Sequence, residues 1–298
     1  MPQPVHVTFI HGLANKPAPN ELARIWLSAL AAPVNGDQGF DLGAVGVSSS
    51  FVYWADLFYD TPVPASEYEA APNRAEKLKT TVLQEISTQA TEWQEDLLMR
   101  LTDGKRALED APIDDTTDGY ERIPIPWFIK ERLMEHFVKE AHDYLFNTNG
   151  IREIIRQRVL DDFARVPSET RHVLVGHSQG TFIGYDVLTS IPECKKIAGF
   201  MTLGSPLGMD EVQDKLTWSR DNGFPTKLIG DWVNVYDPFD VVARLDPVLA
   251  NDFRKDGVET VIDTKEENWG TWRHSATKYF KGPLLRKHLR ILCGREGA

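Results

Sequence analysis

The sequence predicts an α/β fold, with a mainly parallel central sheet flanked by helices. Short runs of β-branched and apolar residues alternate with stretches of helical periodicity along the chain. This alternation is typical of a parallel sheet covered by helices on both faces. A second observation is that the strand pattern at Arg171–Val175 leads into a glycine-rich turn followed by a helical stretch. No internal repeat or low-complexity tract points to another architecture.

The first predicted unit is a strand, a loop and a helix. Val5–Ile10 is a β-branched run typical of a strand, and it ends at His11-Gly12. A helix is expected over Asn20–Ala31, with Asn20 as its N-cap. Its apolar residues are spaced to form one buried face, made of Leu22, Ile25, Trp26, Ala29 and Leu30.

The later elements follow from the helical spacing of apolar residues and from short β-branched or apolar runs typical of strands. Two helices are expected, one from Thr148 or Asn149 to about Ala164 and one over Ser275–Leu292. Strands are expected at Ser50–Ala55, Arg171–Val175, Gly199–Leu203, Trp232–Tyr236 and Thr260–Ile262.

Composition excludes several functional classes. The formal net charge of −11 disfavours nucleic acid as a partner, because phosphate binding needs clustered lysine and arginine. No apolar stretch approaches the roughly 20 residues that cross a bilayer, and the first residues lack the pattern of a signal peptide. Cys194 and Cys293 are too few for a disulfide framework and are expected as buried, reduced thiols. We therefore expect a cytoplasmic protein without a transmembrane segment.

A single domain over residues 1–298 is expected, with residues 66–147 inserted as a helical cap. Within this cap, the apolar stretch Ile123–Ile129 is either a lid element or an anchor to the core. The acidic stretch Asp114–Gly119 departs from a calcium loop at Thr116 and Ile125, where carboxylate ligands would be needed. Neither a metal nor another cofactor is expected.

The motif that carries chemistry is Gly176-His177-Ser178-Gln179-Gly180. Glycines on both sides of Ser178 remove the Cβ atoms that would collide in a tight strand-to-helix turn. Such a turn exposes the serine hydroxyl above the ends of the strands. The flanking strand and helix patterns supply the context that this motif requires, so Ser178 is predicted to be a nucleophile.

With His11-Gly12 after an early strand and Thr202–Pro206 after a later one, this motif resembles those of the α/β-hydrolase superfamily, particularly its esterase and lipase-like members. The resemblance implies a nucleophile, an acid and a base in that order along the chain. Asp240 matches the acid position, with Asp237 as the alternative. His274 matches the base, whereas His288 lies inside a predicted helix.

The resemblance also implies an oxyanion hole formed by the backbone N–H groups of Leu13 and Gln179. His177 is interpreted as structural or as lining the pocket. Trp269 and Trp272, close to His274, are interpreted as pocket walls or as ordinary packing.

The predicted function is hydrolysis of a carboxylic ester, of a small-molecule or lipid-like kind, through an acyl-enzyme on Ser178. Thioesterase, amidase or acyltransferase activity would use the same residues. A non-catalytic binding protein that retains the fold is the alternative from another class.

Overall fold

The computed structural model describes residues 3–34, 36–70, 139–219, 221–240, 242–243, 246–270 and 273–296. Among them, a six-stranded, wholly parallel sheet has the order β2-β1-β3-β4-β5-β8. The predicted fold class, an α/β fold on a parallel sheet, is confirmed. The strands of this sheet are β1 (Val5–Ile10), β2 (Val47–Val52), β3 (Arg171–His177), β4 (Ile197–Leu203), β5 (Leu228–Tyr236) and β8 (Ile262–Lys265).

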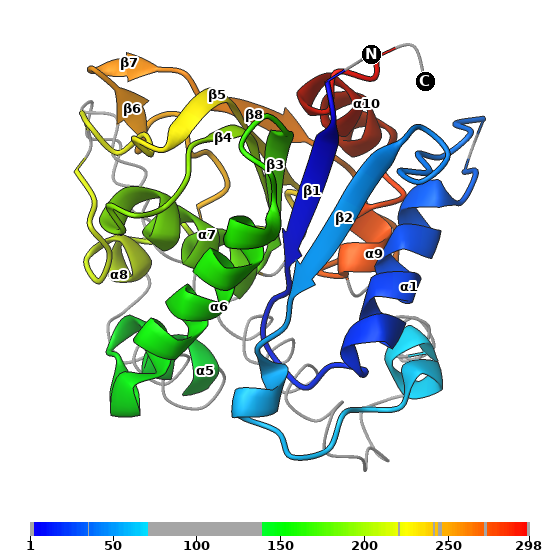
Figure 1. Ribbon diagram of the computed structural model, residues 1–298, viewed down its shortest axis with the longest axis horizontal. Helices are drawn as coiled ribbons and strands as arrows, with labels where there is room; N and C mark the ends of the chain where they lie inside the picture. Colours follow the sequence, from blue (N-terminus) through cyan, green and yellow to red (C-terminus); the bar gives the residue numbers. More distant parts are fainter. Residues whose placement is uncertain are drawn as a thin grey trace, which may run out of the picture.

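Helices cover both faces of the sheet (Figure 1). On one face α5 (Lys139–Leu145), α6 (Ile151–Arg165) and α7 (Gln179–Ser190) share a hydrophobic core with Leu174 and Phe200. On the other face α1 (Pro19–Ala31), α9 (Ala276–Tyr279) and α10 (Pro283–Leu292) pack on Val173, Val175 and Met201. The remaining elements are α8 (Asp210–Gln213), the short antiparallel pair β6 (Arg254–Lys255) and β7 (Val258–Glu259), and 3-10 turns at Ala55–Leu57 and Thr148–Gly150.

Helix α1 has the predicted buried face, but its start differs from the prediction. All five residues of that face are buried. The helix begins at Pro19 and is capped by Ala18, without a side-chain cap hydrogen bond. Asn20 therefore lies inside the helix and is not its N-cap. Proline is favoured at this position because it has no N–H to leave unpaired and its φ is already helical.

Strand β2 begins three residues earlier than predicted, at Val47, and ends at Val52. Its polar beginning hid it, because Ser48 and Ser50 do not resemble a buried strand. Both hydroxyls bond the His6 ring at 2.8 Å, and Ser50 also donates to Asp162 of α6 at 2.7 Å. A side-chain network therefore takes the place of apolar packing here.

The last predicted helix, Ser275–Leu292, is two helices. Helix α9 ends at Tyr279, and α10 starts at Pro283 after Gly282, which is extended. Proline cannot supply the N–H that a continuous helix would need. The carboxylate of Glu266 accepts hydrogen bonds from the N–H groups of Leu284 and Leu285, so it satisfies two donors at the start of α10.

Helix α6 begins at Ile151, after Gly150 in the left-handed region, so neither Thr148 nor Asn149 is its cap. The predicted cap, residues 66–147, lies mostly outside the described residues, as do its stretches 114–119 and 123–129. Its last part, α5, packs into the same core as α6 and α7.

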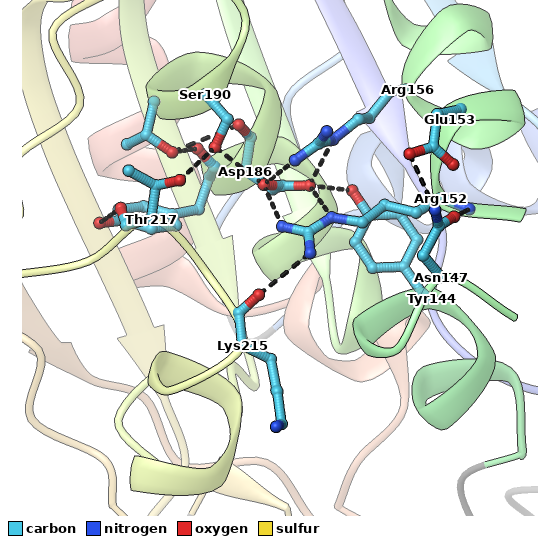
Figure 2. A network of polar contacts seen from close by, with 11 residues as sticks. Tyr144, Asn147, Arg152, Glu153, Arg156, Asp186, Ser190, Lys215 and Thr217 are labelled. Carbon is cyan, nitrogen blue, oxygen red and sulfur yellow. Dashed lines mark hydrogen bonds and ion pairs between the residues drawn. The ribbon is translucent and has the colours of Figure 1, made fainter. Parts of the chain in front are cut away.

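A buried charge network fastens α5 and α6 to α7 (Figure 2). The carboxylate of Asp186, on α7, accepts from the guanidinium groups of Arg152 and Arg156 at 2.6 to 2.9 Å. Tyr144 of α5 donates to the same carboxylate at 2.7 Å. Burial alone would raise the pKa of Asp186, but the two arginines and the tyrosine lower it to about 2. The helix that begins beside Ser178 is thus held in place by several charged hydrogen bonds.

Cys194 and Cys293 are both buried and free, as predicted. No helix within the described residues is long and apolar enough to cross a membrane.

Candidate active site

The predicted site residues lie on loops at one edge of the sheet. Since the strands are parallel, their carboxyl ends meet at that edge, where ligands of open α/β sheets bind. His11-Gly12-Leu13 follows β1, Ser178 follows β3, and Asp240 lies in the loop after β5. His274 lies between β8 and α9.

Ser178 occupies a strained turn between β3 and α7. Its φ of 55° and ψ of −126° are unusual for a residue with a side chain. A Cβ on Gly176 would lie 2.6 Å from the Gly180 carbonyl oxygen, and one on Gly180 would collide with the Ile10 carbonyl. A Cβ on Gly12 would lie 2.5 Å from Cβ of Ser178. The turn therefore needs glycine at all three positions.

The structure brings His274 and Asp240 together. Both carboxylate oxygens of Asp240 lie 2.8 Å from Nδ1 of His274. Asp240 also accepts from the backbone N–H of Val242 at 2.8 Å. Burial would raise the pKa of this carboxyl, but His274, Tyr279 and Val242 stabilise the charged form and bring its pKa below the ordinary value. An ionised Asp240 accepts a hydrogen bond from the N–H at Nδ1, and this bond selects the tautomer of His274 in which Nε2 carries no proton.

Asp237, the alternative acid, has other partners. Its carboxylate accepts from the backbone N–H groups of Phe239 and Asn268, each at 2.8 Å. It also forms an ion pair with Arg273 at 3.2 Å. Asp237 ties the loop after β5 to the segment that carries the histidine.

The other histidines differ in position. The ring of His177 lies 4.8 Å from the ring of His274, between their centroids, so the residue before Ser178 contacts the predicted base. Burial, followed by the charges of His274 and Lys16, lowers the pKa of His177 well below the usual value, which keeps the ring neutral. His288 bonds Thr264 at 3.1 Å, away from these residues, on α10.

The loop that carries the predicted oxyanion donor Leu13 is held by His11. The N–H of Trp54 donates to Nε2 of His11 at 3.0 Å, so Nε2 is an acceptor and the proton of the neutral ring is on Nδ1. Nδ1 lies 2.8 Å from the carbonyl oxygen of Gly12 and donates to it. That carbonyl shares a trans peptide with the N–H of Leu13, so the orientation of this N–H is fixed.

Lys16 closes the same loop from its other end. Its buried ammonium donates to the carbonyls of Leu13 and Ala14. Burial lowers the pKa of Lys16 to about 7, although Glu140 acts in the opposite direction. Gln179, the other predicted donor, is the first residue of α7, where backbone N–H groups have no partner within the helix.

Two residues of the site were not predicted. Gly204 has a φ of 54°, and a Cβ there would lie 2.8 Å from Oδ2 of Asp240 and 3.1 Å from Nδ1 of His274. Tyr279 donates its hydroxyl to Asp240 at 2.7 Å. In the sequence, Gly204 stands out only because it follows a strand, and Tyr279 only because it precedes Gly282. Neither position specifies a contact with Asp240.

The predicted pocket walls are tested only in part. Trp269 is 47% exposed, and the ammonium groups of Lys278 and Lys281 lie over its ring at 5.5 and 5.7 Å. It is therefore a surface residue. Trp272 lies outside the described residues. Within the described part of the chain, no group of three or more His, Cys, Asp and Glu residues is arranged to hold a metal ion.

Comparison with known proteins gives distant structural matches only. No family model matches the chain, and no curated protein matches it. An uncharacterized protein from Pseudomonas aeruginosa is 12% identical, with a TM-score of 0.29 over 98% of this chain and 48% of that one, so the chain spans about half its length. The siderophore hydrolase EstB from Aspergillus nidulans is 10% identical, with a TM-score of 0.38 over 98% of this chain and 83% of that one. Matches at these levels do not assign an activity.

Proposed function

We propose that the protein is a serine hydrolase that cleaves carboxylic esters. The observation that carries the proposal is a strained serine between a parallel strand and a helix, at the same sheet edge as a buried histidine–carboxylate pair. Backbone strain of this kind persists only where the surrounding structure holds it in place.

In the proposed reaction, Oγ of Ser178 attacks the ester carbonyl while Nε2 of His274 takes the serine proton. Asp240 stabilises the resulting imidazolium. The oxyanion is bound by the N–H groups of Leu13 and Gln179. Collapse of this intermediate breaks the ester bond, and His274 returns the proton to the departing alcohol. Water, deprotonated by His274, then attacks the acyl-enzyme, and the acid leaves as Ser178 recovers its proton.

Labelling with a fluorophosphonate probe tests the nucleophile. We expect wild type to be modified at Ser178 and Ser178→Ala not to be modified. Ser190→Ala is the matched control, because Ser190 lies at the other end of α7 and bonds Asp186 at 3.0 Å. If folded wild type stays unlabelled, the hydrolase proposal fails and a binding protein that retains the fold is favoured. If Ser178→Ala is labelled, the nucleophile is another residue.

A panel of p-nitrophenyl esters of graded chain length, with a matched thioester and anilide, tests the substrate class. The ester proposal predicts hydrolysis of the esters well above that of the anilide. Faster cleavage of the thioester or the anilide would replace it with thioesterase or amidase activity. Transfer of the acyl group to an added alcohol in preference to water would indicate an acyltransferase. We keep the cytoplasm as the proposed location, to be tested by cell fractionation.

A further inference from the structure

Tyr279, the last residue of α9, makes two hydrogen bonds inside the candidate active site. Its hydroxyl lies 2.7 Å from Oδ2 of Asp240 and 3.0 Å from the backbone nitrogen of Asp237, and its side chain is fully buried. A hydroxyl has one proton to donate. The N–H of Asp237 can only donate, so it uses a lone pair of the tyrosine oxygen. The tyrosine proton is therefore directed at Asp240.

We propose that Tyr279 is a positioning residue that keeps Asp240 ionised and aimed at His274. The proposal rests on the proposed function, in which Asp240 orients the base. Oδ2 is shared between Nδ1 of His274 and the tyrosine hydroxyl, and Val242 holds Oδ1. The N–H of Ala243 also donates to Oδ1, at 3.3 Å. Four donors from three segments of the chain thus fix the plane of one buried carboxylate.

The electrostatics agree with this role. Burial, followed by the adjacent charge of Asp240, raises the pKa of Tyr279 well above its usual value, so the hydroxyl keeps its proton at neutral pH. Several titratable and charged groups surround Asp240. His274, before α9, and Tyr279, at the end of α9, bond it directly. Asp237 lies in the same loop as Asp240 and is paired with Arg273, and His177 packs against the His274 ring.

Loss of the Tyr279 hydroxyl should shift the pH dependence of the reaction in one direction. Without this donor the negative charge of Asp240 is less stabilised, so the coupled Asp240–His274 pair binds a proton more tightly. The coupled pair then keeps its bound proton to a higher pH. For Tyr279→Phe we expect the acid limb of the reaction to move up by about one pH unit, the scale of one charged hydrogen bond.

The rate of Ser178 modification by a fluorophosphonate, measured from pH 5 to 9, is the readout, because it requires no knowledge of the substrate. Tyr144→Phe is the matched control. Tyr144 also donates to a buried carboxylate at 2.7 Å, that of Asp186, but that pair contains no residue of the site. The control is expected to lose stability without any shift of the acid limb.

The outcomes separate the two proposals. If wild type is labelled at Ser178 and Tyr279→Phe has an unshifted acid limb, the role of Tyr279 is refuted and the proposed function stands. If wild type is not labelled, the proposed function fails. Should Tyr279→Phe not fold, 3,5-difluorotyrosine at position 279 retains the hydroxyl and donates more strongly. The acid limb should then move down in pH, and an unchanged limb would refute the proposal.

Discussion

Substitution of the two candidate acids by asparagine should affect different quantities: kcat for Asp240 and the free energy of unfolding for Asp237. The carboxylate of Asp240 accepts a hydrogen bond from Nδ1 of His274 at 2.8 Å. In Asp240→Asn this charged acceptor is replaced by a neutral amide. The imidazole then favours the tautomer with its proton on Nε2, where it cannot take the serine proton. We expect kcat to fall by roughly 10⁴-fold, the effect of the corresponding change in serine proteases.

In Asp237→Asn the losses concern stability. The side chain is fully buried and loses its ion pair with Arg273, while one amide oxygen can still accept a backbone N–H. We expect a loss of about 2–3 kcal/mol in the free energy of unfolding, with kcat within roughly tenfold of wild type.

Initial rates on p-nitrophenyl acetate and urea unfolding curves on the same preparations give both quantities. A 10⁴-fold loss of kcat in folded Asp237→Asn, with an active Asp240→Asn, would refute the assignment of the acid from these contacts.

Three further changes test other parts of the structure. Gly204→Ala should reduce fluorophosphonate labelling at least roughly 100-fold, because the added Cβ would lie 2.8 Å from Asp240. In the control Gly257→Ala, the residue has a φ of 77° but open space around it, so only stability should fall. Equal labelling of the two variants would contradict this. The arginines and Tyr144 lower the pKa of Asp186 to about 2, below the ordinary value of 3.8, so its contribution to stability is present above pH 4 and is lost as the pH falls toward 2. Urea unfolding of wild type and Asp186→Asn across that window should converge at low pH, and a constant difference would count against the network. Cys194 and Cys293, with pKa values raised by burial to about 11 and 12, should react with Ellman's reagent only after unfolding, and rapid reaction of the native protein would show that they are accessible.

Local patterns were sufficient for much of the fold. The buried face of α1 and the strand before Ser178 follow from periodicity alone. The face of α1 has the predicted residues, and β3 has the predicted start but runs two residues further, to His177. The start of α1 and the break before α10 were missed although local prolines decide both, whereas the start of β2 depends on longer-range contacts. Strand β2 starts among serines because Asp162 and His6 satisfy them, and no property of Ser48 by itself reveals those partners.

The candidate site divides in the same way. Ser178, His274 and Asp240 could be named because the resemblance supplies their order along the chain, and their roles as a triad stay a prediction. Tyr279 and Gly204 could not be named, because their significance lies in which side chain they approach across the sheet edge. A tyrosine at the end of a short helix has many possible partners, and only the packing of α9 selects Asp240.

The strand order has a consequence for how the chain acquires its site during synthesis. Strand β1 lies between β2 and β3, and Val5 pairs with Arg171. One edge of β1 therefore stays unpaired until β3, more than 160 residues further along the chain, has been synthesised. His274 lies further along the chain still, after β8, the strand that pairs with β5. Such non-local pairing forms slowly, and a strand edge that has no partner is open to aggregation until the pairing strand is in place.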